Sequence, residues 1–498
     1  MDGYSRSTCL PNTRLDVIKA ITDWIAGEST DQKRVLWLYG VAGSGKSTLS
    51  TTIAETLRSL QRLGAFFFFN RDIQERNAAT IIRTLAYQLA VFDARIGAEV
   101  SRIVESNPII TDMPLEFQFT HLLAAKALHS LEWSGGPIVI VIDALDECGS
   151  ETDRKILLQV LSKGISTLPS FVRIVIASRQ ERDIDDVFAS HSSVLSYDLN
   201  VDSTTAPKDI TTFIRYRLDE IRRANKYITF PLDWPGEHEV CILRDRAAGL
   251  FIWASTACLY IDGHDPCLRL HELVTQRSVD ISSSPFANLD RLYKTGLESA
   301  GIWADAQFRS DCCDIFGVIL CARTPLSPAM IDSLLDLPRQ CLQSVSRLGC
   351  VLRWSPTEAV RILHPSFHDY LSTRCHNEPW FIDIEHHNAK LAIHCIELLD
   401  KTLRENICGL KLPHPVRGET LPAAVSYSCR FWVDHVCSIT RISDDIGEKI
   451  FHFLERHLLH WMEALAILKR HGDTIRSLQH LLNWIKVRYL VRILYPHS

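Results

Sequence analysis

A glycine-rich segment near the start of the chain has the residue types needed to bind phosphate. It fits the pattern G-x-x-x-x-G-K-[ST] at every position. Glycines let the backbone wrap around phosphate oxygens, while Lys46 would reach the β- and γ-phosphates and the Ser47 hydroxyl would ligate Mg²⁺. A strand is expected before the segment and a helix after it, which disfavours the alternative of a chance glycine-rich turn. The candidate phosphate-binding residues are Gly40, Val41, Ala42, Gly43, Ser44, Gly45, Lys46, Ser47 and Thr48.

An apolar run that ends in acids supplies the second part of such a site. Ile138–Ile142 is wholly apolar and is followed directly by Asp143. A buried strand has little reason to end in a carboxylate unless a cation or a donor is present there. We therefore expect Asp143 to hold Mg²⁺ together with Ser47, either directly or through a water molecule. Asp146 and Glu147 follow, and we prefer Glu147 as the base that activates water, with Asp146 in support. The alternative, a solvated acidic turn, is disfavoured beside a complete P-loop.

Two further residues have open interpretations. Arg179 follows the apolar run Val172–Ala177, and ligands of open sheets lie outside the carboxyl ends of strands. Arg179 would therefore reach the γ-phosphate, or it would pair on the surface with Glu181 or Asp183. His364, judged by its chemistry alone, is more often a packing residue than a ligand.

Five short apolar runs alternate with longer helical patterns through the first 200 residues. This alternation predicts βαβ units, and the apolar character of the runs indicates strands covered on both faces. Right-handed crossovers then favour an α/β core with a doubly wound, mostly parallel five-stranded sheet. The expected strands are Val35–Tyr39, Ala65–Phe69, Ile138–Ile142, Val172–Ala177 and Val194–Leu199, with helices such as Ser47–Leu60 and Ala78–Ala90 between them.

The remaining chain is mostly helical in pattern. Helices are expected at Asp209–Arg223 and Glu239–Tyr260, and a serine-rich break follows at Ser282–Pro285. Short β-like runs at Gly349–Trp354 and Ala359–Leu363 favour a small winged-helix-like module. The predicted division is 1–30 lead-in and helix, 31–205 α/β core, 206–285 helical domain, 286–375 winged-helix-like domain and 376–498 C-terminal helical domain.

The composition of the chain indicates which partners and which cellular compartment to expect. The net charge of −5 gives no general attraction to nucleic acid. The 15 cysteines include no C-x-x-C pair, which disfavours zinc and indicates reduced thiols. The longest apolar stretch, Ala247–Ile261, is shorter than the roughly 20 residues of a membrane span. We therefore expect a cytoplasmic protein without a transmembrane segment.

Three phrases together resemble a known family. They are GVAGSGKST at Gly40–Thr48, IVIVIDALDEC at Ile138–Cys148 and IVIASR at Ile174–Arg179. The chain resembles NACHT-domain NTPases of the STAND class, particularly the fungal set called nephrocystin-like. The resemblance extends from about Cys9 to about Met462, and it is most specific over the first 180 residues.

The resemblance implies a switch that binds ATP or ADP with Mg²⁺ and hydrolyses ATP slowly. In such proteins ADP holds a closed form, and ATP exchange permits opening and self-association, in some cases in innate-immune or non-self-recognition signalling. By the same resemblance Thr13 and Arg14 line the nucleotide, and His364 matches a winged-helix histidine that contacts the β-phosphate of ADP.

The sequence also departs from the family's usual plan. No WD-type or ankyrin-type repeat follows the core, which suggests a short form or effector and sensor proteins acting in trans. Two other functions stay open: a nucleotide-binding scaffold without significant turnover, and a P-loop enzyme of another class. A guanine-specific N-K-x-D motif fails at Ile228, which favours ATP over GTP.

Overall fold

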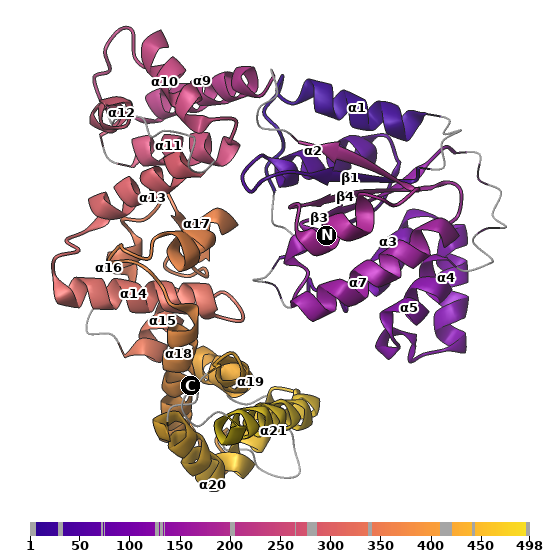
Figure 1. Cartoon of the computed structure of the whole chain (residues 1–498), viewed down its shortest axis with the longest axis vertical. Helices are drawn as coiled ribbons and strands as arrows, with labels where there is room; N and C mark the ends of the chain where they lie inside the picture. The colour runs from indigo at the N-terminus through magenta and orange to yellow at the C-terminus, as the bar shows by residue number, and fades with distance from the viewer. Residues whose placement is uncertain are drawn as a thin grey trace. The chain divides into compact units, whose positions relative to one another are not determined.

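The computed structural model describes most of the chain in two compact units, 1–292 and 293–498, each considered by itself (Figure 1). The described residues are 6–27, 33–70, 73, 75–124, 129, 133, 135–199, 205–263, 265–275, 286–336, 341–408, 421–440 and 444–494. The serine-rich break expected at 282–285 lies outside them.

A five-stranded sheet forms the centre of the first unit. Its strands are β1 (Val35–Tyr39), β2 (Leu63–Phe68), β3 (Ile138–Asp143), β4 (Val172–Ser178) and β5 (Val194–Asp198). Their order is β2-β3-β4-β1-β5. All five expected strands are confirmed to within two residues at either end. The sheet was expected to be mostly parallel, and every pairing is parallel.

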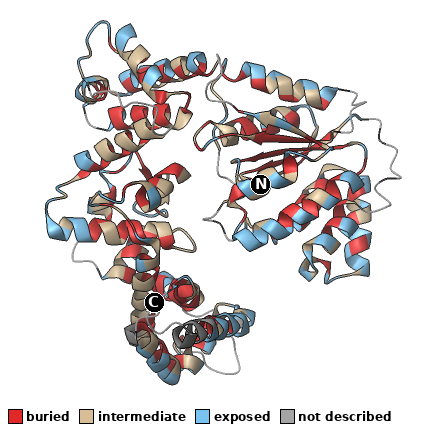
Figure 2. Ribbon diagram, viewed as in Figure 1, coloured by how far each residue is buried: buried red, intermediate tan, exposed pale blue. Residues whose placement is uncertain are grey.

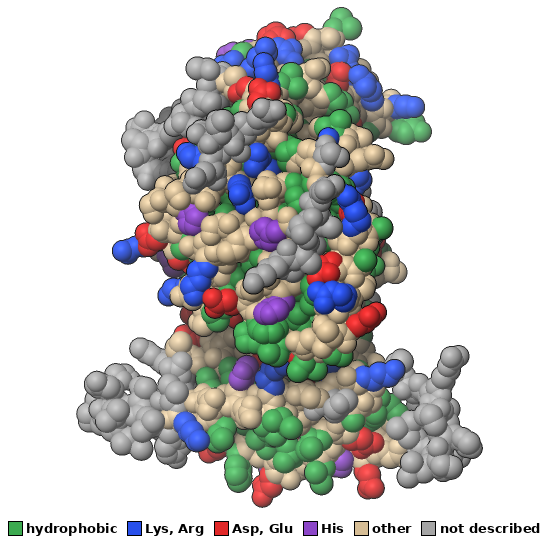
Figure 3. All heavy atoms as spheres, turned by 90° about the vertical axis from the view of Figure 1, so that its right-hand side faces the viewer, with side chains coloured by type: hydrophobic (Ala, Val, Ile, Leu, Met, Phe, Trp, Pro, Cys, Tyr) green, Lys and Arg blue, Asp and Glu red, His purple; other side chains and the backbone are tan. Residues whose placement is uncertain are grey.

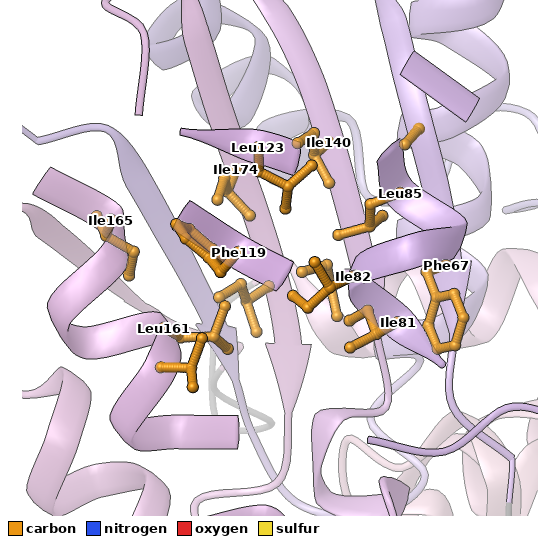
Figure 4. Close-up of a cluster of buried hydrophobic side chains, with 14 of the residues drawn as sticks. Phe67, Ile81, Ile82, Leu85, Phe119, Leu123, Ile140, Leu161, Ile165 and Ile174 are labelled. Atoms are coloured by element: carbon orange, nitrogen blue, oxygen red, sulfur yellow. The ribbon is translucent and has the colours of Figure 1, made fainter. Parts of the chain in front are cut away.

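Helices cover both faces of this sheet. One face presents Trp37, Ile140 and Ile142 to a core built with helices α3, α4, α5, α7 and α8. Figure 4 shows part of it, where Ile81, Ile82 and Leu85 of α3 meet Ile140 and Ile174 of the sheet. These helices are α3 (Ile81–Phe92), α4 (Ala94–Ser106), α5 (Leu115–Gln118), α7 (Glu151–Gly164) and α8 (Arg182–Phe188).

The opposite face of the sheet is covered by the two earliest helices, α1 (Leu15–Ala26) and α2 (Lys46–Ser59). Because successive strand residues point to opposite faces, strands buried on both sides are apolar at nearly every position. The central strands β1, β3 and β4 are buried almost throughout, as Figure 2 shows, whereas the edge strands β2 and β5 are buried only in part. This three-layer core therefore explains the continuous apolar runs that the sequence displays.

Helices complete the first unit, and one of them differs from the prediction. They are α9 (Ala206–Ala224), α10 (Glu237–Ala247), α11 (Phe251–Asp262), α12 (Pro266–Thr275) and the first part of α13 (Ala287–Ala300). The single helix predicted over Glu239–Tyr260 is wrong, because the chain breaks between α10 and α11. Ala248 and Gly249 have φ values of 44° and 80°, and a right-handed helix cannot continue through left-handed residues. For the same reason Ala247–Ile261 is not one continuous helix.

The second unit is largely helical around one small antiparallel pair of strands. The pair, β6 (Leu352–Arg353) and β7 (Arg361–Ile362), lies within the two β-like runs of the sequence. The helices are the rest of α13, α14 (Ala306–Cys321), α15 (Pro328–Leu335), α16 (Cys341–Val345), α17 (Pro365–Asp369), the π-helical turn η6 (Tyr370–Arg374), α18 (Ile384–Thr402), α19 (Ala423–Cys437), α20 (Asp444–Ile467) and α21 (His471–Leu494).

Two further features of the described residues are surface charge and helix hydropathy. Basic and acidic side chains are intermixed on the face drawn in Figure 3. Among the residues that the structure describes, no helix is both long enough and apolar enough to cross a bilayer.

Candidate phosphate-binding site

The glycine-rich segment forms a loop between β1 and α2, and its glycines lie where the backbone requires them. Gly43 and Gly45 have φ values of 80° and 94°, which side chains rarely tolerate. A side chain at Gly40 would come within 3.1 Å of the Leu199 carbonyl oxygen. The loop therefore depends on these three glycines.

The loop opens directly into the N-terminus of α2. The N-cap residue of this helix is Gly45, which supplies no side-chain hydrogen bond, so the first N–H groups and the positive dipole end can face an anion. The Ser44 hydroxyl is also buried, with no hydrogen-bond partner within the described parts of the chain. A buried polar group without a partner is costly, and a bound phosphate would supply one.

Lys46 extends back beneath the loop. Its ammonium group donates hydrogen bonds to the carbonyl oxygens of Gly40 and Val41 at 2.8 and 2.9 Å. Burial lowers the pKa of Lys46 from 10.5 to about 8, although the nearby Asp146 carboxylate acts in the opposite direction. The lysine thus lies under the loop with an ammonium that burial disfavours and an anionic ligand would stabilise.

The side chains of Ser47 and Asp143 are in contact. The Ser47 hydroxyl donates to Asp143 Oδ1 at 3.3 Å, and Asp143 is fully buried at the end of β3. Hydroxyl and carboxylate oxygens suit Mg²⁺, which is usually bound by one or two carboxylates together with substrate phosphates. Within the described ranges no group of three or more His, Cys, Asp or Glu residues could hold an ion. The Ser47 hydroxyl and the Asp143 carboxylate fit a magnesium ion that would be shared with a phosphate ligand.

The strand order brings the end of β4 between the ends of β1 and β3. The buried Trp37 indole donates to the Ser178 hydroxyl at 2.9 Å and orients this end of β4. The next residue, Arg179, binds Asp146 twice: its backbone N–H donates to Oδ1 at 3.0 Å, and Nε lies 3.2 Å from Oδ2. Of the two surface partners considered for Arg179, Asp183 pairs with Arg154 instead, at 2.7 Å.

A strained turn positions the acids that follow β3. Ala144 has a φ of 56°, a left-handed conformation that costs a non-glycine residue about 1–2 kcal/mol. It begins the short 3₁₀ turn η3 (Leu145–Glu147), in which the Glu147 backbone N–H donates to the Ala144 carbonyl at 2.8 Å. Asp146 is buried and Glu147 is half-buried at this turn. Strain of this kind tends to persist where function demands it.

Arg14 connects the lead-in, the loop and the helices that follow the sheet. Its guanidinium donates to the Ser44 carbonyl oxygen at 2.8 Å and lies 4.9 Å from the centre of the Phe251 ring. Its backbone N–H donates to Asp209 Oδ2 at 3.0 Å. The neighbouring Thr13 is buried, with its hydroxyl bonded to the Leu10 carbonyl at 2.7 Å. Arg14 thus lies directly against the P-loop.

Several residues at this site were not singled out from the sequence. Asp209 and Phe251 come from α9 and α11, and the Ile252 backbone N–H donates to the Gly43 carbonyl at 3.1 Å. For Phe251 and Ile252, the sequence signal was the glycine at the break before α11. Arg6 forms an ion pair with Asp143 at 2.7 Å, and nothing in its polar surroundings in the sequence distinguishes it.

His364 belongs to the second unit, where it caps α17. Its Nδ1 accepts the Ser366 backbone N–H at 3.1 Å and lies 2.7 Å from the Ser366 hydroxyl. Accepting through Nδ1 places the proton of the neutral ring on Nε2. The cap is a structural function that the sequence did not reveal.

The three-layer core and its loop define the class of protein: an α/β protein of the P-loop NTPase fold. Residues 17–179 match the family model described as Nephrocystin 3, N-terminal. Vegetative incompatibility protein HET-E-1 of Podospora anserina is 25% identical over 495 residues, covering 91% of this chain and 34% of that protein. The matched residues span the α/β core, so the chain is similar there to the nephrocystin-like NACHT NTPases. It spans about a third of the length of that curated relative.

Solved structures with similarity to the chain are more distant. A STAND protein with a tetratricopeptide repeat sensor from Pyrococcus horikoshii is 13% identical with a TM-score of 0.46, covering 97% of this chain and 55% of that one. A Drosophila ORC structure with DNA and Cdc6 is 12% identical with a TM-score of 0.26, covering 94% of this chain and 69% of the other.

Proposed function

We propose that this protein is a regulatory switch that binds ATP or ADP with Mg²⁺, hydrolyses ATP slowly and changes conformation and self-association with the bound nucleotide. The observation that carries the proposal is the complete P-loop, in which an uncapped helix end, Lys46, Ser47 and Asp143 converge. The convergence of a dipole end, an ammonium and oxygen ligands suits a phosphate chain with its metal.

Each residue of the site then has a distinct role. Lys46 would leave its carbonyl partners to bind the β- and γ-phosphates, and Ser47 and Asp143 would hold the metal. When bound, Mg²⁺ neutralises phosphate charge. Glu147 is proposed to orient and deprotonate the attacking water. Arg179 fixes Asp146 beside Lys46 and is proposed to respond to the γ-phosphate.

Arg14 provides the proposed connection from the nucleotide to the rest of the first unit. Its contacts with Ser44, Asp209 and Phe251 join the loop to α9 and α11. A shift of the loop on nucleotide exchange would be transmitted through these contacts to the helices. We propose that Thr13 and Arg14 line the nucleotide on this side.

The biological setting is proposed by similarity. The matched relative is named a vegetative incompatibility protein, which favours a role for this chain in non-self recognition within the cytoplasm. The switch would then act with effector or sensor proteins and with further copies of itself. The net charge of −5 does not favour nucleic acid as the partner.

Nucleotide content and binding test the proposal directly. We expect freshly purified protein to release ADP on denaturation and to bind a fluorescent ADP analogue. Lys46→Ala should weaken binding by about 10- to 100-fold, since it removes a charged hydrogen-bond donor. Lys155 is exposed and pairs with Glu151, so Lys155→Ala serves as the control, and this variant should bind the ADP analogue with unchanged affinity. Light scattering in ADP and in a slowly hydrolysed ATP analogue would measure self-association. Absence of both nucleotide and binding contradicts the proposal.

Turnover is tested separately, because the protein could bind nucleotide without hydrolysing it. Glu147→Gln should abolish slow phosphate release while leaving ADP affinity within about threefold, since only the proposed base is changed. Equal phosphate release from the wild type and the variant would instead favour a nucleotide-binding scaffold.

His364 is proposed to donate a hydrogen bond from Nε2 to the β-phosphate of ADP. Because His364 also caps α17, His364→Ala removes two interactions at once. Asparagine caps helices well, so His364→Asn restores the cap and isolates the ligand role. Faster ADP release from both variants, with normal thermal stability only in the asparagine variant, supports the role. Unchanged ADP retention in His364→Ala refutes it.

A further inference from the structure

Arg6 supplies a positive charge at the carboxylate that is proposed to hold the metal. Its Nη1 lies 2.7 Å from Asp143 Oδ2, while Asp143 Oδ1 accepts the Ser47 hydroxyl. The Asp143 side chain is 1% exposed and the Arg6 side chain 25% exposed. A carboxylate this deeply buried needs a compensating cation, and Arg6 provides it.

Two further contacts hold Arg6 and the residues after it against the core. The Arg6 guanidinium lies 4.2 Å from the centre of the Phe68 ring, and Phe68 is the register partner of Asp143 in the sheet. Three residues on, the Cys9 backbone N–H donates to the Thr52 hydroxyl of α2 at 2.8 Å. Residues 6–12, hereafter the N-terminal arm, therefore run from the end of β3 across α2.

We propose that Arg6 and Mg²⁺ compete for Asp143, so that loading of the magnesium–nucleotide complex displaces the N-terminal arm from the core. This inference rests on the proposed function, because it takes Asp143 as a metal ligand. A guanidinium and a divalent cation repel each other, and both draw on the same carboxylate. Binding of one therefore weakens binding of the other.

The competition has consequences in both directions, because coupling between two binding events is reciprocal. Arg6 raises the magnesium concentration needed to load the site, which guards the empty form against premature loading. Magnesium–nucleotide in turn releases the N-terminal arm, which runs from the Asp143 carboxylate toward Arg14. The N-terminal arm is therefore bound to the core when the metal site is empty and released when the site is loaded.

Magnesium titrations of fluorescent ADP binding test the first consequence. We compare the wild type with Arg6→Ala and with Arg6→Gln, which keeps the side-chain length without its charge. Both variants should reach half-saturation at a magnesium concentration lower by about fivefold or more. Arg58, exposed on α2 and paired with Glu55, supplies the control Arg58→Ala, which should stay within about twofold of the wild type.

Hydrogen exchange of the N-terminal arm tests the second consequence without depending on activity. In the wild type, amides of residues 6–12, including Cys9, should exchange faster with ADP and Mg²⁺ than with ADP in a chelator. In Arg6→Ala they should exchange fast under both conditions.

The outcomes separate this inference from the proposed function. Normal ADP binding with the same magnesium dependence in all variants, and arm exchange that does not respond to magnesium, would overturn the competition alone. Failure of the wild type to bind ADP at any magnesium concentration would overturn the proposed function and the competition together.

Discussion

Lys46 should couple nucleotide binding to proton uptake. Its pKa is lowered to about 8 chiefly by burial, whereas bound phosphates favour the charged ammonium and would raise the pKa again. Binding should therefore take up roughly 0.1 proton at about pH 7, 0.5 at about pH 8 and 0.9 at about pH 9, from the fraction of empty sites that are deprotonated. The same fractions predict an ADP affinity that falls roughly tenfold between about pH 7 and about pH 9.

Calorimetry of ADP binding in buffers of different ionisation enthalpy measures this uptake directly. Lys46→Arg supplies the control, because a guanidinium stays charged across the whole range and its proton uptake should be close to zero. The lowered pKa also means that the folded, empty protein binds fewer protons than the unfolded chain between about pH 8 and pH 10.5, so its stability should rise over that window. A wild-type affinity that is flat with pH, with heats independent of the buffer, would refute the reasoning.

Two further predictions concern Asp209, which accepts a hydrogen bond from Arg14, and Arg179, which pairs with Asp146. Asp209→Ala removes the acceptor of a buried backbone N–H and should lower the free energy of unfolding by about 1–3 kcal/mol in denaturant titrations, whereas the exposed Asp219→Ala should change it by less than about 0.5 kcal/mol. Equal effects would contradict a structural role for Asp209. Arg179→Ala removes a positive charge that lowers the pKa of Lys46, and it leaves the Asp146 carboxylate unpaired to raise that pKa. The pH at which ADP affinity falls should therefore move upward. An unchanged midpoint of the affinity-versus-pH curve would contradict this electrostatic explanation.

The sequence was most informative where a local pattern decides the structure. The five strands followed from apolar runs, because strands of a parallel sheet are covered on both faces. The loop from Gly40 to Ser47 followed from a fixed spacing whose glycines have a conformational reason. The one clear error, a continuous helix over Glu239–Tyr260, arose because apolar residues continue on both sides of Ala248–Gly249. The left-handed backbone there turns the chain so that α11 begins against the P-loop.

The ion pairs that involve arginines of this site could not be predicted from the sequence. Arg6 and Asp143 are 137 residues apart, and Arg14 and Asp209 are 195 apart. Arg179 could be placed at the end of its strand, but its partner depends on β4 lying between β1 and β3. An ion pair has no sequence period, so only the order of the strands and the path of the lead-in determine which charges meet.

The sequence by itself determined that this protein has a parallel α/β core with a phosphate-binding loop, since backbone conformation and burial impose periods and spacings that can be recognised. The tertiary structure decided how the site is held together: Arg6 on Asp143, Arg179 on Asp146, and Arg14 between Ser44 and Asp209. Those contacts arise from long-range packing, because folding brings distant charged side chains out of water together and each must then find a partner.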